Sequence, residues 1–246
     1  MKKPIMIHVL ALFLISTLAS CASCSSDLKE NGKENGKEEK PDTEEVRPES
    51  FASDDEMLDY IQKVHLNYMW DGAEPTSGLA RERIHMDGVY PENDQNVITS
   101  GGSGFGIMAI LAGIDRGYVT REEGLARMER IVSFLEKADR FHGAYPHWWY
   151  GDTGKVKPFG QKDNGGDLVE TAFLIQGLLA VHQYYVNGNE KEKALAQRID
   201  QIWRDVDWNW YRQGGQNVLY WHWSPTYGWE MNFPVHGYNE CMIMYI

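Results

Sequence analysis

Two kinds of predicted helix alternate along this 246-residue chain, and the alternation strongly restricts its fold. The segments that begin near residues 102 and 166 are apolar on nearly every side, which predicts helices buried on both faces. The segments 120–138 and 190–203 each combine an apolar stripe with a charged face, as helices between a core and solvent do. Such alternation is typical of nested rings of helices. The sequence therefore predicts an all-α fold of the (α/α)n barrel type.

Local start signals support this assignment. Ser53 is followed three residues later by Glu56, and Thr120 by Glu123, so each pair predicts a capping box at a helix start. The predicted helices cover residues 54–68, 102–116, 120–138, 166–186 and 190–203, and a sixth begins near residue 238. The segment Glu240–Ile246 is apolar, with no capping signal, polar turn or partner segment after it. We therefore expect the chain to be a fragment of a longer domain.

Residues 1–20 have the pattern of a bacterial lipoprotein signal peptide. Lys2 and Lys3 precede an apolar stretch, residues 5–18, that is too short to span a membrane comfortably. The segment Leu18-Ala19-Ser20-Cys21 matches a lipobox, which predicts that Cys21 becomes the lipidated N-terminus. We expect an anchor in a bacterial outer membrane, on its periplasmic or cell-surface face. An uncleaved membrane anchor is the alternative.

Residues 21–50 are mostly charged and polar, so we expect a disordered acidic tether there and a folded part over 51–246. The formal net charge of the whole chain is −12, which makes nucleic acid and anionic membrane surfaces poor partners. Only Cys241 lies in the folded part, so no disulfide framework is expected. The histidines show no metal-binding spacing. The sequence predicts no metal site.

Three acidic residues precede an apolar helical segment. Asp163, Asp167 and Glu170 are spaced i, i+4 and i+7, so they would lie along one face if the segment is helical. The sequence Asn164-Gly165-Gly166 is a helix start signal, and acidic residues there could merely cap the helix. Capping requires one or two carboxylates, and here there are three. The pattern therefore indicates a buried helix that opens into an acidic pocket.

Tryptophans gather in the second half of the chain, where eight of the nine lie between residues 148 and 229. Many of them occupy the connections 139–164 and 205–237, which are long, rich in glycine and proline, and suited to binding loops. Aromatic rings beside carboxylates are common in sugar-binding sites, although some of these rings must simply fill the core. We expect a carbohydrate ligand, with packing alone as the alternative.

Hydrolysis of a glycosidic bond requires two carboxyl groups, one to protonate the leaving oxygen and one to activate water or attack carbon. Asp163, Asp167, Glu170 and Glu240 are the candidates, and crowding is expected to raise the pKa of at least one. The alternative is structural: Asp163 would cap a helix, and Glu240 would accept a hydrogen bond from a buried backbone N–H.

Several motifs, taken in order, resemble the bacterial glycoamylase-like domain of glycoside hydrolase family 144, the endo-β-1,2-glucanases and their relatives. The similarity runs from about residue 76 to the last residue. It is carried by Gly78-Leu79-Ala80-Arg81-Glu82-Arg83, by residues 103–109, by Gly143-Ala144-Tyr145-Pro146-His147-Trp148, by residues 163–180 and by Gly237-Tyr238-Asn239-Glu240.

The resemblance implies an (α/α)6 barrel that hydrolyses β-1,2-glucans with inversion and without a cofactor. The family residues that match the four acidic candidates line the catalytic pocket, and the match assigns them no individual roles. Because the family domain is longer, we expect residues 51–246 to be its N-terminal half, inactive alone. Arg83, Trp148 and Trp223 are further candidates for sugar contacts.

Two other functions stay open. A non-catalytic glycan-binding lipoprotein could share the same helices and anchor. A lyase or hydrolase of uronic-acid glycans could share the fold, but a carboxylated sugar would require a basic cleft, and the predicted pocket is acidic.

Overall fold

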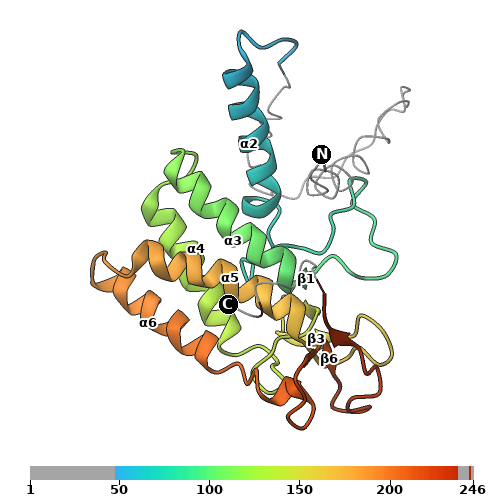
Figure 1. Cartoon of the computed structure of the whole chain (residues 1–246). Helices are drawn as coiled ribbons and strands as arrows, with labels where there is room; N and C mark the ends of the chain where they lie inside the picture. Colours follow the sequence, from blue (N-terminus) through green and yellow to red (C-terminus); the bar gives the residue numbers. More distant parts are fainter. Residues whose placement is uncertain (1–47, 238–243, 245–246) are drawn as a thin grey trace, which may run out of the picture. The chain divides into compact units, whose positions relative to one another are not determined.

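The computed structural model describes residues 48–237 and 244 (Figure 1). The chain divides into two units, of which the second begins at Glu49, and the description below concerns that unit alone. Four sequence predictions fall outside the described residues: the signal peptide, the lipidated Cys21, the catalytic candidate Glu240 and the sixth helix. Nearly all of the predicted tether also lies there.

The five helices predicted within the described residues are present. α4 begins after the predicted capping box, in which the Thr120 hydroxyl accepts from the Glu123 N–H at 3.2 Å and the Glu123 carboxylate accepts from the Thr120 N–H at 2.8 Å. The helices are α2 (Asp54–Trp70), α3 (Ser100–Asp115), α4 (Arg121–Leu135), α5 (Leu168–Tyr185) and α6 (Glu190–Arg204).

α3 and α5 are the two helices predicted to be buried, and they pack directly against each other (Figure 1). Glycines make the close approach possible: a Cβ on Gly104 would lie 2.2 Å from the Phe173 carbonyl oxygen, and one on Gly177 would lie 2.4 Å from the Gly104 carbonyl oxygen. α4 and α6 lie beside this pair and turn their charged faces outward. The predicted distinction between buried and amphipathic helices is therefore confirmed.

The core fills the space between α3, α4, α5 and α6 and the connection that follows α4. Its largest fully buried side chains are aromatic. Trp149 packs edge-on against Tyr145 and Phe134, and its indole N–H donates to the Asp139 carbonyl at 3.2 Å. This bond matters because a buried indole N–H without a partner would destabilise the fold.

The prediction of an all-α fold is wrong for the connections, where the described residues contain three small antiparallel sheets. One joins β1 (Val97–Thr99), β2 (Trp148–Tyr150) and β3 (Lys155–Lys157); another joins β4 (Gly166–Asp167) and β6 (His222–Trp223); the third joins β5 (Leu219–Tyr220) and β7 (Pro234–Val235). Strands of two or three residues are too short to show alternation in a sequence. The described part is mostly helical, and it does not close into a barrel.

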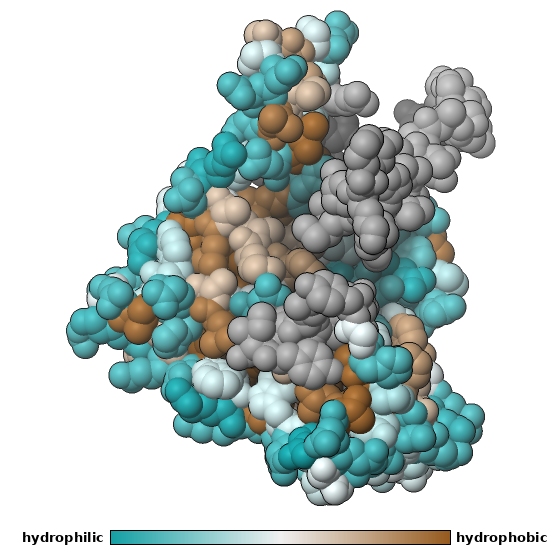
Figure 2. All heavy atoms as spheres, in the orientation of Figure 1, coloured by the Kyte–Doolittle hydropathy of each residue, from teal (hydrophilic) through white to brown (hydrophobic). Residues whose placement is uncertain are grey.

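Few side chains of α2 are buried. Leu66 packs against Gly113 of α3, but Leu58, Ile61 and Val64 expose 50%, 39% and 39% of their surface. Figure 2 shows hydrophobic residues at the surface along α2 and over the helices beneath it. An apolar side of α2 is thus left uncovered by the described residues. No helix in the described part of the chain is both long and apolar enough to cross a membrane.

Candidate functional site

The carboxylate of Asp167 lies where a strand becomes a helix. The backbone N–H of Asp167 donates to the Tyr145 carbonyl at 2.8 Å, and β4 pairs with β6 so that Asp167 lies opposite His222. The next residue starts α5, and Asp167 caps it by accepting the Glu170 N–H at 2.9 Å. The side chain is fully buried.

This arrangement corrects the expectation that three acidic residues share one helix face. The helix begins at Leu168, so Asp163 and Asp167 lie before it and Glu170 alone lies within it. The reason is that the Gly166–Asp167 segment is extended and pairs with another strand instead of starting the helix. Asp163 and Asp167 still come close together, through a loop and a short strand.

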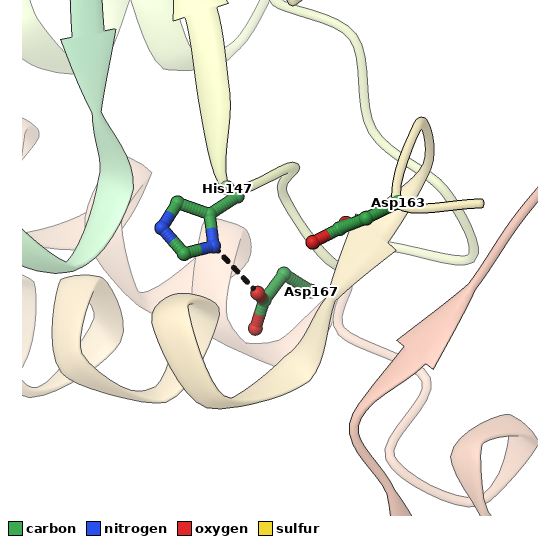
Figure 3. A group of neighbouring side chains, drawn as sticks. All are labelled: His147, Asp163 and Asp167. Atoms are coloured by element: carbon green, nitrogen blue, oxygen red, sulfur yellow. Dashed lines mark hydrogen bonds and ion pairs between the residues drawn. The ribbon is translucent and has the colours of Figure 1, made fainter. Parts of the chain in front are cut away.

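Two histidines contact these carboxylates, and we call the group of His147, Asp163, Asp167 and His222 the His–Asp cluster. His147 Nδ1 lies 3.1 Å from Asp167 Oδ2, as Figure 3 shows. His222 Nε2 lies 3.3 Å from Asp163 Oδ2 and 3.5 Å from Asp167 Oδ2. Both histidine side chains are largely buried. The cluster therefore joins residues from three separate segments of the chain.

The charges within the His–Asp cluster compensate one another. Burial opposes protonation of His222, yet its contacts with Asp163 and Asp167 outweigh burial and raise its pKa to about 9. Burial also opposes protonation of His147, but its bond to Asp167 and the negative charges of Asp167, Glu170 and Asp163 together outweigh burial and raise its pKa. Conversely, burial would raise the pKa of Asp167, but its bonds to both histidines lower it. Asp167 therefore stays ionised near neutral pH.

Asp167 is therefore not the carboxyl group whose pKa crowding was expected to raise. The raised pKa values of both histidines favour positive charge beside the carboxylates, which offsets part of their negative charge. His147 and His222 are site residues that the sequence did not single out. Each of them is next to a tryptophan in the aromatic-rich connections, and this is the sequence signal that could have identified them.

The same atoms have a spacing that could hold a metal ion. Ligand atoms of His147, Asp163 and Asp167 all lie within 4.8 Å of one another. A metal, however, binds neutral imidazole and must displace the ring proton. Because both histidine pKa values are raised, protons compete for these sites near neutral pH. The absence of a metal requirement stays a prediction.

Glu170 lies in the first turn of α5 and reaches the start of α3. Its Oε2 accepts a hydrogen bond of 2.9 Å from the Gly101 N–H. A helix N-terminus is a favourable place for a negative charge. Glu170 also contributes to the raised pKa of His147 through its charge, which places it within electrostatic range of the His–Asp cluster.

Aromatic rings surround the carboxylates. Phe159 stacks on His147 with ring centroids 4.1 Å apart and meets Trp148 edge-on at 4.7 Å. Trp223 lies opposite Gly166 in the β4–β6 pair and meets His142 edge-on at 4.6 Å. Carboxylates with aromatic neighbours can bind the hydroxyls and the apolar faces of sugars.

The structure brings together most of the residues predicted for the site. Asp163 and Asp167 share the His–Asp cluster, Glu170 lies within range of it, and Trp148 and Trp223 belong to the aromatic surroundings. Arg83 is different, because its described ion pairs are with Glu82 and Asp94. Its predicted sugar contact has no support in the described geometry.

Comparison with known proteins relates the chain to enzymes acting on β-1,2-linked glucans, although no family model matches it. A provisionally named glucoamylase from Bacteroides caccae is 84% identical, with a TM-score of 0.77, over 78% of this chain and 47% of that protein. An endo-β-1,2-glucanase from Chitinophaga pinensis, solved with sophorotriose and glucose, is 70% identical, with a TM-score of 0.77, over 78% of this chain and 46% of that protein.

Among curated proteins, an exo-β-1,2-glucooligosaccharide sophorohydrolase from Parabacteroides distasonis is 53% identical over 196 residues, which are 79% of this chain and 26% of that protein. The chain thus spans about half the length of these two solved structures and about a quarter of the curated relative. Over that span the agreement in sequence and fold is high. The chain is a relative of endo-β-1,2-glucanase, as its resemblance to glycoside hydrolase family 144 predicted.

Proposed function

We propose that the chain is the N-terminal half of a glycoside hydrolase that cleaves β-1,2-glucans with inversion. The observation that carries the proposal is the grouping of Asp163, Asp167 and Glu170 beside aromatic rings, one of which, Phe159, is exposed. It occurs in a chain that is 70% identical to an endo-β-1,2-glucanase solved with sophorotriose. Sophorotriose is therefore the probe of choice for this site.

Asp167 does not act as the proton donor in this proposal. It is fully buried, its pKa is lowered, and its oxygens are occupied by His147, His222 and the start of α5. Its role is to position the two histidines and, through His222, Asp163. A buried charge with several partners suits that role because its geometry is fixed.

An inverting hydrolase needs a base that activates water and an acid that protonates the leaving oxygen, with the two carboxyl groups separated by roughly 6.5–9.5 Å. We assign Asp163 as the base, because it is a carboxylate held by His222 at the edge of the buried cluster. Among the residues predicted from sequence, Glu170 and Glu240 remain as candidates for the acid. No cofactor has a part in this chemistry.

The catalytic form, in this proposal, has the (α/α)6 barrel that the resemblance implies. Alternation of buried and amphipathic helices supports a ring arrangement. The exposed apolar side of α2 supports it too, since a neighbouring helix of such a ring would cover that side.

Hydrolysis is tested on two proteins. One is this chain, and the other, called the extended form here, joins the C-terminal part of the Bacteroides caccae relative after Gly237. Each is incubated with linear β-1,2-glucan while new reducing ends are counted and the anomeric form of the product is followed by NMR. We expect the extended form to release α-anomeric products. Binding without any new reducing ends would instead support the glycan-binding lipoprotein.

We also propose that Cys21 carries a lipid that anchors the protein to a bacterial outer membrane, on its periplasmic or cell-surface face. The lipobox and the charged tether support this. Expression in bacteria with labelled palmitate should label the protein but not a Cys21→Ala variant. Equal labelling of a Cys24→Ala variant and the parent would show that Cys21 is the modified residue.

A further inference from the structure

Phe159 is an exposed aromatic residue that the structure holds in a fixed place. It follows β3, and 52% of its surface is exposed. Its backbone N–H donates to the Asp163 carbonyl at 2.9 Å, and the Asp163 N–H donates to the Gly160 carbonyl at 3.1 Å. These reciprocal bonds close a short loop. The position of the Phe159 ring is therefore linked to the position of Asp163.

The ring is linked to the second carboxylate as well. It stacks on the imidazole of His147 with an interplanar angle of 21°, and His147 Nδ1 binds Asp167. Trp148 meets the Phe159 ring edge-on. One face of Phe159 is thus packed against His147, and the exposure of the residue leaves aromatic surface available beside the His–Asp cluster.

Other exposed phenylalanines in the described part of the chain do not stack on His147, although Phe233 packs on Trp221, whose ring stacks on His222. Phe105 and Phe233 expose 53% and 54% of their surface, and their described ring contacts are with Phe173 and Trp221. Trp148, the sequence-predicted sugar contact, has Lys157 Nζ 4.7 Å from the centre of its ring. Lysine therefore occupies part of the indole face that a sugar would use.

We propose that the exposed surface of Phe159 packs against a glucose unit of the substrate and holds it beside Asp163, with Trp148 supporting the phenyl ring from the side. The C–H groups on one face of a glucopyranose form an apolar surface that suits an aromatic ring, while the hydroxyls are left for the carboxylates. This inference rests on the proposed function, because the ligand is a β-1,2-linked glucose oligosaccharide.

The test measures the dissociation constant of sophorotriose by isothermal titration calorimetry, on both the chain and the extended form. Phe159→Ala is compared with the parent, with Phe159→Trp and with the control Phe105→Ala, which removes an equally exposed ring. We expect Phe159→Ala to weaken binding about tenfold, which corresponds to about 1.4 kcal/mol. Phe159→Trp should stay within threefold of the parent, and Phe105→Ala within twofold.

The outcomes separate this inference from the proposed function. Tight binding by the parent and equal binding by Phe159→Ala would overturn the role of Phe159 and leave the proposed function standing. Equal weakening by Phe159→Ala and Phe105→Ala would also overturn it. If neither parent form binds sophorotriose or cleaves β-1,2-glucan, the proposed function fails and the inference fails with it. Circular dichroism and the thermal midpoint identify any variant that has not folded.

Discussion

The backbone N–H of Gly101 donates to Glu170 Oε2 at 2.9 Å, and this bond joins the first turns of α3 and α5. A Cβ at position 101 would lie 2.3 Å from the same oxygen, so a side chain there must displace the carboxylate. We predict that Gly101→Ala lowers the activity of the extended form at least tenfold. Initial rates on β-1,2-glucan measure the effect.

The matched control for that substitution is Gly106→Ala in the same helix. Its Cβ would lie 3.0 Å from the sulfur of Met69, a flexible side chain that can move. Alanine also favours a helix over glycine by about 1 kcal/mol. Activity should therefore be retained in Gly106→Ala. Equal losses in both variants would show that crowding at Glu170 is not the cause.

Asp167→Asn tests the buried charge. Asparagine keeps a similar shape and can still cap α5, but it removes the negative charge that both buried histidines contact. Removing one partner of a buried ion pair costs about 3–5 kcal/mol, so the free energy of unfolding should fall by an amount of that order. Urea denaturation measures it. The control is Asp200→Asn, which removes a surface ion pair with Arg204 and should leave the midpoint unchanged.

His222 makes stability depend on pH. Its pKa rises from an ordinary value of 6.5 to about 9 in the folded protein. The stabilisation is therefore fully present below pH 6.5 and is lost as the pH rises through about 9, and by linkage it amounts to about 3 kcal/mol at most. His147 acts in the same direction.

Denaturation of the parent and of His222→Gln between pH 6 and pH 10 checks this dependence. The parent should be the more stable protein at pH 6, and the difference should shrink by pH 10. A difference that grew with pH would contradict protonation of His222 in the folded state.

Divalent cations should not stabilise the protein near neutral pH. A cation in the His–Asp cluster would have to displace the protons that its carboxylates hold on His147 and His222. We therefore expect the thermal midpoint at pH 6.5 to be the same with EDTA and with one equivalent of zinc. A rise of several degrees with zinc, absent in His147→Gln, would show a metal site.

The helices could be predicted because their signals are local. The apolar period and the capping residues place α4 and α6 to within a few residues of their observed bounds. The His–Asp cluster could not be predicted in the same way. Asp167 meets His222 through a two-residue ladder, and nothing near either residue in the sequence identifies its partner.

Two glycines explain why the start of α5 was predicted at residue 166 instead of Leu168. Gly165 and Gly166 precede an apolar segment, which is a reasonable helix start signal, and the helix begins shortly after them. Yet Gly166 lies across from Trp223 in a strand pair, and that long-range pairing determined its conformation. The grouping of acidic and aromatic residues could be predicted from the sequence, whereas the two histidines beside Asp167 could be found only from the fold.

The β4–β6 pairing also determines where the chain can change in length. If β5 stays in place, inserting one residue between Tyr220 and Trp221 shifts the register of β6 by one. Trp221 would then lie opposite Asp167 in place of His222. Gly214 and Gly215, by contrast, lie in the exposed turn before β5 with open space around them. Reporter peptides or natural insertions are therefore best accommodated at that turn, where the loop can grow without shifting the register that holds the ionised pair.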